Sequence, residues 1–284
     1  MATRLISLVL TFAFATTAVA DLSMSYRRLL PLEGGSNFRD LGGYRTADGQ
    51  TVARGRLFRS GAMTALTDAD MAYLDRFGIK TIVDLRSNEE IGLYPNHWAA
   101  KRGIEVLTGD YSFAAMMRSE ESGERPEMSE LYPRLLESIG PQIKTYFHEA
   151  LEAQAPMVVN CSAGQDRTGI AAALMLLLLG VPEPTVIEDY LLSTDFRRPA
   201  VEQGSVDLAE AAKTNAFAAM MLEYRKAMPH PDRPNPLVTP DGVAYLAFVI
   251  ERIRNEYGSV EAYAEGELGI DAQEMATLRR RYLR

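Results

Sequence analysis

Residues 157–180 read MVVNCSAGQDRTGIAAALMLLLLG, and this stretch decides the fold. Its first residues, 157–159, form a short apolar run that predicts a buried strand. Residues 170–179 are apolar on every side, which predicts a helix in the interior of a domain. A short loop joins the strand to the helix. Cys161 therefore lies at the end of the strand, and Arg167 opens the helix.

The loop between Cys161 and Arg167 has the features of an anion-binding site. Its members are Ser162, Ala163, Gly164, Gln165 and Asp166. Amides of such a loop and of the helix N-terminus would point at a bound oxyanion, and the helix dipole favours negative charge there. The same field would favour the thiolate form of Cys161, which is the nucleophilic form. Arg167 can hold two oxygens of a phosphoryl group. The alternative is a structural cysteine beside a helix-capping arginine, because cysteine is often buried.

The rest of the chain predicts an α/β fold in which a central, mostly parallel sheet is flanked by helices. Strands are expected at 51–58, 79–85 and 104–107, and a helix capped by Thr67 is expected to end near residue 77. Further helical stretches are expected at 131–154, where Pro133 and Pro141 mark starts or kinks, after Pro182, at 205–228 and in the C-terminal region as a helical extension. The Met- and Ala-rich stripe of 205–228 is interpreted as a core or helix-pairing face.

Composition limits the classes of partner. The formal net charge of −8 makes nucleic acid and anionic lipid surfaces poor partners. Cys161 is the single cysteine of the sequence, so no intramolecular disulfide can form and no second thiol can resolve an oxidised one. No cluster of residues has metal-ligand spacing.

The N-terminal residues predict export. Residues 1–20, MATRLISLVLTFAFATTAVA, have an early arginine, an apolar core and a small-residue cleavage site near Ala20 and Asp21. We expect a signal peptide and a secreted or periplasmic protein. The alternative is a membrane anchor, but the apolar run is short for one, so no stable membrane span is expected. Residues 21–284 are then expected to form a single catalytic domain with a helical insertion, or cap, around residues 195–240.

Three motifs together resemble the bacterial tyrosine-protein phosphatase family of the protein-tyrosine/serine type, which is related to dual-specificity phosphatases. They are NFRDLGG at 37–43, DLRS at 84–87 and CSAGQDRTG at 161–169. The resemblance extends over nearly all of the chain after residue 20. It implies the cysteine-phosphatase fold and hydrolysis of phosphate monoesters through a phosphocysteine, without a metal or other cofactor. The expected substrates are phosphorylated peptides, proteins or small phosphoesters; some members of the family also accept phosphoinositides.

The resemblance assigns roles to the residues of the loop. Cys161 is the expected nucleophile, and Arg167 is expected to bind the phosphoryl oxygens. Backbone amides of the loop, from Ser162, Ala163, Gly164 and Gln165 onward, complete the phosphate cradle. Thr168 is expected either to hydrogen-bond the sulfur or to be an ordinary first-turn hydroxyl.

One carboxyl group is needed as general acid and base, and two are candidates. Asp166 lies inside the loop, where the resemblance places the acid, and its proximity to the nucleophile favours it. Asp84 ends a predicted strand whose carboxyl end faces the same crevice. The alternative for Asp84 is an ion pair that orders Arg86 or Arg167. We interpret Arg39, Asp40, Arg59 and Arg86 as structural or ion-paired residues.

Two positions depart from the family pattern and keep other functions open. The family usually has His where Asn160 stands, which motivates a pseudophosphatase that binds phosphorylated ligands without turnover. It commonly has Lys where Gln165 stands, which weakens the case for phosphoinositides. Sulfur transfer of the rhodanese type is a third possibility, because it also uses a cysteine in an anion loop. Tyr111, Phe113 and Met116 are proposed as a flap over the site.

Overall fold

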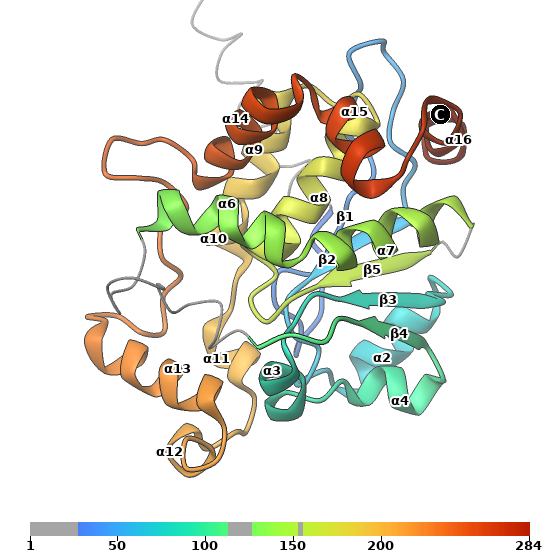
Figure 1. The fold of residues 1–284 in the computed structure, drawn as a ribbon. Helices are drawn as coiled ribbons and strands as arrows, with labels where there is room; N and C mark the ends of the chain where they lie inside the picture. Colours follow the sequence, from blue (N-terminus) through green and yellow to red (C-terminus); the bar gives the residue numbers. More distant parts are fainter. Residues whose placement is uncertain (1–27, 113–126, 153–155) are drawn as a thin grey trace, which may run out of the picture.

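A five-stranded sheet forms the centre of the computed structural model, which describes residues 28–112, 127–152 and 156–284 (Figure 1). The strand order is β1-β2-β5-β3-β4. The strands are β1 (Arg39–Asp40), β2 (Leu57–Ser60), β3 (Thr81–Asp84), β4 (Glu105–Thr108) and β5 (Met157–Asn160). Only β1 runs antiparallel to its neighbour. The predicted α/β fold with a mostly parallel sheet is confirmed.

The central strand β5 is buried on both faces, which explains its uninterrupted apolar run. Met157 and Val159 belong to the larger core cluster, whereas Val158 belongs to a second cluster on the opposite face. Successive side chains of a strand point to opposite faces, so the two clusters are the two sides of the sheet. In the register of the sheet, Asn160 lies opposite both Ser60 of β2 and Asp84 of β3. Cys161 therefore follows the carboxyl end of the middle strand.

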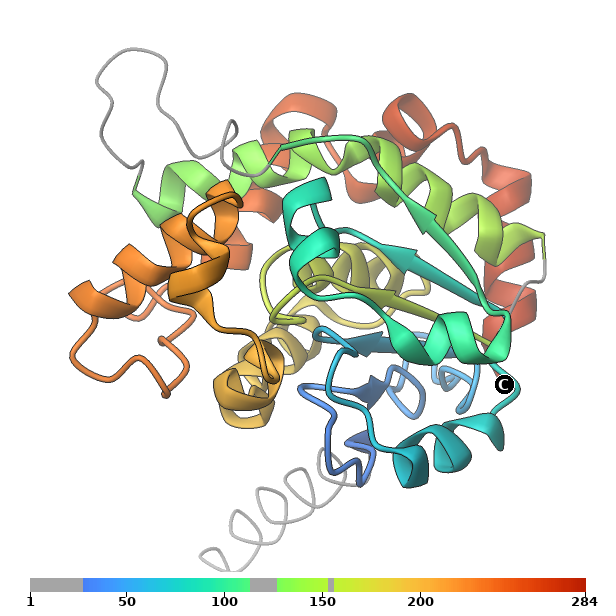
Figure 2. The ribbon, with the colours of Figure 1, turned by 90° about the horizontal axis from the view of Figure 1, so that it is seen from below.

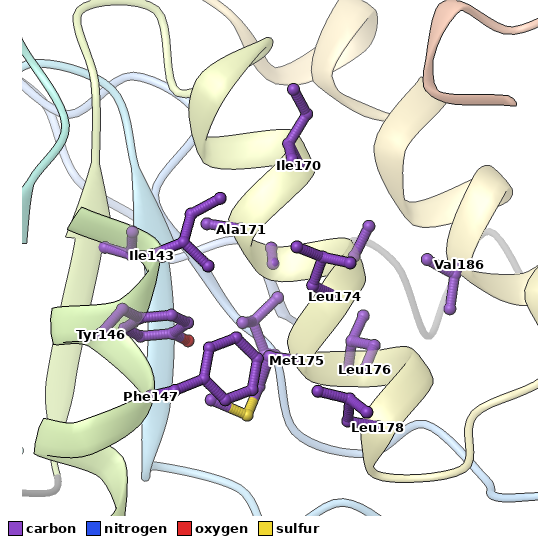
Figure 3. Close-up of a cluster of buried hydrophobic side chains, with 14 of the residues drawn as sticks. Ile143, Tyr146, Phe147, Ile170, Ala171, Leu174, Met175, Leu176, Leu178 and Val186 are labelled. Atoms are coloured by element: carbon purple, nitrogen blue, oxygen red, sulfur yellow. The ribbon is translucent and has the colours of Figure 1, made fainter. Parts of the chain in front are cut away.

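Helices cover the larger core on one face of the sheet. They are α6 (Met128–Ser138), α7 (Gly140–Leu151), α8 (Arg167–Leu178), α9 (Glu183–Leu191), α14 (Tyr245–Tyr257), α15 (Val260–Tyr263), the π-helix η1 (Ala264–Leu268) and α16 (Ala272–Tyr282). Every residue of α8 except Leu177 is buried, as its all-round apolar sequence predicts. Figure 3 shows Tyr146 and Phe147 of α7 beside Met175 of α8. This packing fixes the helix whose first residue is Arg167.

The opposite face is covered by α2 (Asp68–Asp75) and α4 (His97–Arg102). Thr67 caps α2 as predicted, because its side chain accepts a hydrogen bond from the amide of Asp70. A further helix, α3 (Asn88–Leu93), was not predicted from the sequence. Ser87 and Glu90 form a capping box at its start, so the pattern that predicts this helix is present.

A run of helices, of which α13 is the longest, connects α9 to the last part of the fold. They are α10 (Ser193–Phe196), α11 (Pro199–Gln203), α12 (Leu208–Ala211) and α13 (Ala216–Ala227). From here on we use the name cap for α12 and α13 only, which lie within the insertion expected around residues 195–240. The cap packs on α3, where Phe217 and Leu208 join Leu93 and Tyr94 in a small core of their own. Figures 1 and 2 show the cap in orange at one end of the molecule.

Three predicted elements have different bounds in the structure. The helix expected at 205–228 is two helices, because the side chain of Asn215 caps α13 and ends the preceding turn. The helical stretch expected at 131–154 is also two helices, α6 and α7, which meet at Ile139, and Pro141 lies in the first turn of α7. The strand expected at 51–58 was wrong in extent: residues 51 and 52 form isolated bridges, and β2 begins at Leu57. Gly55 turns the chain between them with a φ of +70°.

Some predictions fall outside the described residues. They include the signal peptide at 1–20 and the flap residues Phe113 and Met116. Among the helices that the structure does describe, none combines the length and the apolar character needed to cross a membrane.

Candidate active site

The loop after β5 bends back on itself around Cys161, which is 1% exposed. Gly164 allows this shape. Its φ is +64°, and a Cβ at this position would lie 2.4 Å from the amide nitrogen of Gly61. A side chain would therefore collide with backbone that cannot move independently of β2. Strand, loop and helix lie where the sequence predicts them, with Arg167 as the first residue of α8.

Residues of the NFRDLGG motif and of β2 hydrogen-bond the backbone of the loop. The carbonyl of Gly164 accepts hydrogen bonds from Asn37 Nδ2 at 2.7 Å and from Arg59 Nη2 at 2.8 Å. Arg59 also pairs with Asp189 at 2.7 Å, and Arg39 pairs with the other oxygen of the same carboxylate at 2.7 Å. All three charged groups are buried. The structural roles that the sequence suggested for Arg39 and Arg59 agree with these contacts.

Asp189 is predicted to stabilise the fold in a pH-dependent manner. Burial alone would raise the pKa of Asp189, but the charges of Arg39 and Arg59 outweigh burial and hold it at about 2, below the ordinary 3.8. Because the pKa of Asp189 is lower in the folded than in the unfolded protein, its ionised carboxylate stabilises the fold at pH values above the unfolded-state pKa of 3.8. This stability is lost as the pH falls through the folded-state pKa of about 2. We therefore expect the difference in free energy of unfolding between wild type and Asp189→Asn to shrink by roughly 2 kcal/mol between pH 5 and pH 2.

Denaturant unfolding at a series of pH values would measure this difference. The comparison cancels the titration of carboxylates that both proteins share. A difference that stays constant across this range would show that Asp189 is not the group that titrates.

Arg167 is held by a carboxylate that sequence reasoning missed. Glu90 of α3 accepts from Arg167 Nη1 at 2.7 Å and from Nη2 at 2.6 Å, and its side chain is fully buried. Ser162 Oγ donates to the same carboxylate at 2.6 Å. Burial would raise the pKa of Glu90, but Arg167 and these hydrogen bonds bring it below its ordinary value. The two hydrogen bonds from Arg167 to Glu90 orient the guanidinium group and keep its charge beside the loop.

Tyr111 lies against the same arginine. Its hydroxyl accepts from Arg167 Nη1 at 2.7 Å and donates to the carbonyl of Leu85 at 2.6 Å. Of the three residues proposed as a flap, this is the one that the structure describes. It contacts the arginine of the loop directly.

The two candidate acids lie in different surroundings. Asp166 is half-buried, lines the pocket that contains Cys161, and accepts hydrogen bonds on Oδ1 from the hydroxyl of Tyr132 and from Gln165 Nε2. Asp84 is buried, pairs with Arg86 at 2.6 Å, and accepts from Asn160 Nδ2 at 3.1 Å. Asp84 does not line the pocket. The contacts of Asp84 match the ion-pair alternative, and of the two candidates only Asp166 lines the pocket.

A second cation, Arg197, contacts the loop and was also missed; its side chain is 18% exposed. Arg197 Nη1 donates to Gln165 Oε1 at 3.0 Å, and its Nη2 pairs with Glu202 at 2.9 Å. Burial would lower the pKa of Arg197, but Glu202 raises it above the ordinary value, so the group is charged. A guanidinium that is itself paired with Glu202 therefore lies beside the neutral Gln165.

Thr168 Oγ1 is buried and has no hydrogen-bond partner among the described residues. The structure therefore does not contain the expected bond from Thr168 to sulfur. The hydroxyl is nevertheless at the first turn of α8, where the sequence placed it.

A pocket of about 450 Å³ opens over the loop. Cys161, Ser162, Ala163, Gln165, Asp166 and Arg167 line its base, whereas α6 and the cap supply its walls. In the part of the chain that the structure describes, no three His, Cys, Asp or Glu side chains come together as metal ligands would. The arrangement of one thiol, amides, an arginine and a carboxyl group suits nucleophilic displacement at an anionic centre.

Comparison with known proteins adds sequence relatives. A family model described as "Tyrosine phosphatase family" matches residues 30–284. A Cupriavidus necator protein with a provisional tyrosine-protein phosphatase name is 29% identical, over 95% of this chain and 94% of its own. The triple specificity protein phosphatase PtpB of Mycobacterium tuberculosis is 29% identical, over 82% of this chain and 91% of its own. A tyrosine-protein phosphatase of Nostoc commune is 28% identical, over 78% and 72%.

Similar solved structures include TpbA of P. aeruginosa, with 16% identity and a TM-score of 0.32 over 61% of this chain and 97% of TpbA. The catalytic core of Siw14 gives 14% identity and a TM-score of 0.35 over 71% of this chain and 96% of that core.

Proposed function

Because the chain belongs to the tyrosine phosphatase family, and so to the phosphoric monoester hydrolases, we propose that it hydrolyses phosphotyrosine through a phosphocysteine on Cys161. Phosphoserine and phosphothreonine are proposed as further substrates. The observation that carries the proposal is the loop itself, in which a buried thiol lies with the bidentate Arg167–Glu90 pair at the base of one pocket. This arrangement supports binding of a dianionic phosphoryl group directly above sulfur.

In the first step, the sulfur of Cys161 attacks phosphorus and the bond from phosphorus to the leaving oxygen breaks. Loop amides and Arg167 offset the negative charge on the three remaining oxygens. The carboxyl group of Asp166 gives its proton to the leaving oxygen. The products are an alcohol or phenol and a phosphocysteine.

In the second step, water attacks the phosphocysteine. The Asp166 carboxylate takes one proton from that water, the bond from phosphorus to sulfur breaks, and sulfur leaves as thiolate. Inorganic phosphate is released, and Asp166 is again protonated for the next cycle. Both Oδ1 hydrogen bonds of Asp166, from Tyr132 and Gln165, leave Oδ2 for the transferred proton.

Steady-state hydrolysis of p-nitrophenyl phosphate and of a phosphotyrosine peptide tests the function. We expect turnover of both, with release of inorganic phosphate. Binding of the peptide without phosphate release would instead establish the pseudophosphatase that Asn160 motivates. Formation of thiocyanate from thiosulfate and cyanide would establish sulfur transfer. Activity on phosphoinositides above that on phosphopeptides would reverse the order of substrates proposed here.

The roles of the two carboxyl groups can be separated by their dependence on the leaving group. We expect Asp166→Asn to lower kcat by about 100-fold or more on phenyl phosphate, whose leaving group needs a proton, and by much less on p-nitrophenyl phosphate. Asp84→Asn is the matched control, because it removes a buried carboxylate that does not line the pocket. If Asp84→Asn alone shows this dependence on the leaving group, Asp84 is the acid.

We also propose that the protein is exported, on the basis of residues 1–20 alone. Expression with and without these residues, followed by N-terminal sequencing of the protein from each cell fraction, tests the proposal. A mature protein that starts near Asp21 and is found outside the cytoplasm would support it. An uncleaved protein that stays in the cytoplasm would contradict it.

A further inference from the structure

One wall of the pocket is rich in apolar side chains, whereas Gln203, Arg233 and Asn235 line other parts of it. The side chains of this wall include Leu208, Phe217, Met220, Met221 and Met228. The first four belong to the cap, and Met228 follows it directly. Leu131 and Leu135 of α6 continue the same wall. The stripe that the sequence suggested was a helix-pairing face is therefore divided: Phe217 and Ala218 pack on α3, whereas the methionines also contribute to the pocket.

The pocket is larger than a phosphoryl group requires. Its volume of about 450 Å³ lies in the range of pockets that enclose a ligand of drug size. The loop takes only the phosphoryl end, so the leaving group must occupy the rest. Methionine side chains are flexible and polarizable, and they adapt to apolar ligands of different shapes.

Much of the positive charge in the pocket beyond the loop is already paired. Of the arginines that line this part, Arg197 is paired with Glu202 and Arg225 with Asp232 at 2.8 Å, and Arg233 is the third. Where a sugar or inositol leaving group meets the Met and Leu side chains of this wall, its hydroxyl groups lose hydrogen bonds to water without replacement. An apolar leaving group loses nothing there and removes its own surface from water.

We propose that this pocket selects phosphate monoesters whose leaving group is apolar and extends beyond a single aromatic ring. The proposal rests on the proposed phosphatase activity of Cys161 and adds the chemical class of its substrate. Esters of hydrophobic phenols are then better substrates than esters of polyols. The cap supplies this selectivity, because its methionines form the wall that the extended group contacts.

A series of para-substituted phenyl phosphates tests the proposal. Phenyl, 4-ethylphenyl, 4-propylphenyl and 4-butylphenyl phosphate have leaving groups of nearly equal basicity, so the chemical step is constant and only apolar length changes. We expect kcat/KM to rise about two- to fourfold for each added methylene until the pocket is full. Two polar esters serve as comparisons: 4-(2-hydroxyethyl)phenyl phosphate, which is similar in length to the propyl compound, and myo-inositol phosphate. Neither is expected to show a higher kcat/KM than phenyl phosphate.

Two variants connect the gain to the cap. Met221→Gln is expected to flatten the rise of kcat/KM with chain length, because it places an amide in the apolar wall. Met275→Gln on α16 is the matched control, since Met275 does not line the pocket, and it is expected to keep the rise. A rise that persists unchanged in Met221→Gln would overturn the assignment to the cap.

The outcomes separate this inference from the function on which it rests. If phenyl phosphate is not hydrolysed at all, the proposed phosphatase activity fails. If phenyl phosphate is hydrolysed but chain length has no effect, or the polar ester gains equally, the activity stands and the substrate class proposed here is wrong.

Discussion

Cys161→Ser is expected to lower kcat for p-nitrophenyl phosphate by on the order of 10⁴-fold or more, because the nucleophile of a covalent mechanism cannot be replaced by a neighbouring group. A serine hydroxyl is far less ionised than a thiol at neutral pH, so the introduced serine would be a poor nucleophile. The described residues include no second cysteine. Steady-state kinetics with a continuous chromogenic assay would measure the loss.

Binding provides the control for this variant. Serine and cysteine are close in size, and the loop amides and Arg167 are unchanged, so Cys161→Ser is expected still to bind inorganic phosphate. Thermal unfolding with and without phosphate checks that the site remains folded. Iodoacetate should silence the wild type in proportion to the thiol it alkylates. Turnover that survives either treatment would exclude Cys161 as the nucleophile.

Glu90→Gln is expected to have the second largest effect, on stability and on activity together. Glu90 and Arg167 are both buried, with side-chain exposures of 0% and 7%. Loss of one member of a buried ion pair leaves an uncompensated charge and typically costs about 3–5 kcal/mol. The guanidinium also loses its fixed orientation, so we expect kcat/KM to fall by roughly 100-fold. Chemical denaturation and steady-state kinetics measure the two losses.

Phosphate should partly restore the stability of Glu90→Gln. A bound dianion supplies the negative charge that Arg167 has lost, so the variant should gain more stability from phosphate than the wild type does. Lys101→Gln provides a comparison at an exposed ion pair, and little change is expected there. Equal stabilisation of wild type and Glu90→Gln by phosphate would contradict the role assigned to this pair.

The loop could be predicted from sequence because its signals are contiguous. An apolar strand, a glycine, an arginine and a buried helix follow one another within residues 157–180, and local physics alone orders them. The same applies to the capping box of α2, where Thr67 and Asp70 lie three residues apart. Each of these predictions needed no knowledge of distant contacts.

Glu90 and Arg197 could not be found in this way. Ser87 and Glu90 have the spacing of a capping box, so the sequence contains evidence for the start of a helix at that position. Nothing in that spacing indicates that the same carboxylate also binds Arg167, 77 residues further on. Arg197 likewise reaches Gln165 only because α9 and α10 fold back toward the loop. Contacts of this kind depend on the path of the chain in space.

Asp84 shows the opposite limit. Its place at a strand end correctly indicated that it would lie near the loop, and its contact with Asn160 shows that it does. A position at the sheet edge near the loop does not determine which group the side chain of Asp84 binds. Arg86, two residues later, takes both oxygens of that carboxylate.

The shared carboxylate of Asp189 has a consequence for how this sequence can diverge. Two guanidiniums depend on one acid, and one of them also holds the carbonyl of Gly164. Loss of Asp189 leaves two buried guanidinium groups without this carboxylate, and loss of either arginine leaves it with a single arginine partner, whereas coordinated replacement of all three with apolar residues removes all three buried charges together. Arg39, Arg59 and Asp189 should therefore vary together among homologues. For the same reason, grafting the Cys161 loop onto another scaffold would require all three residues to be grafted with it.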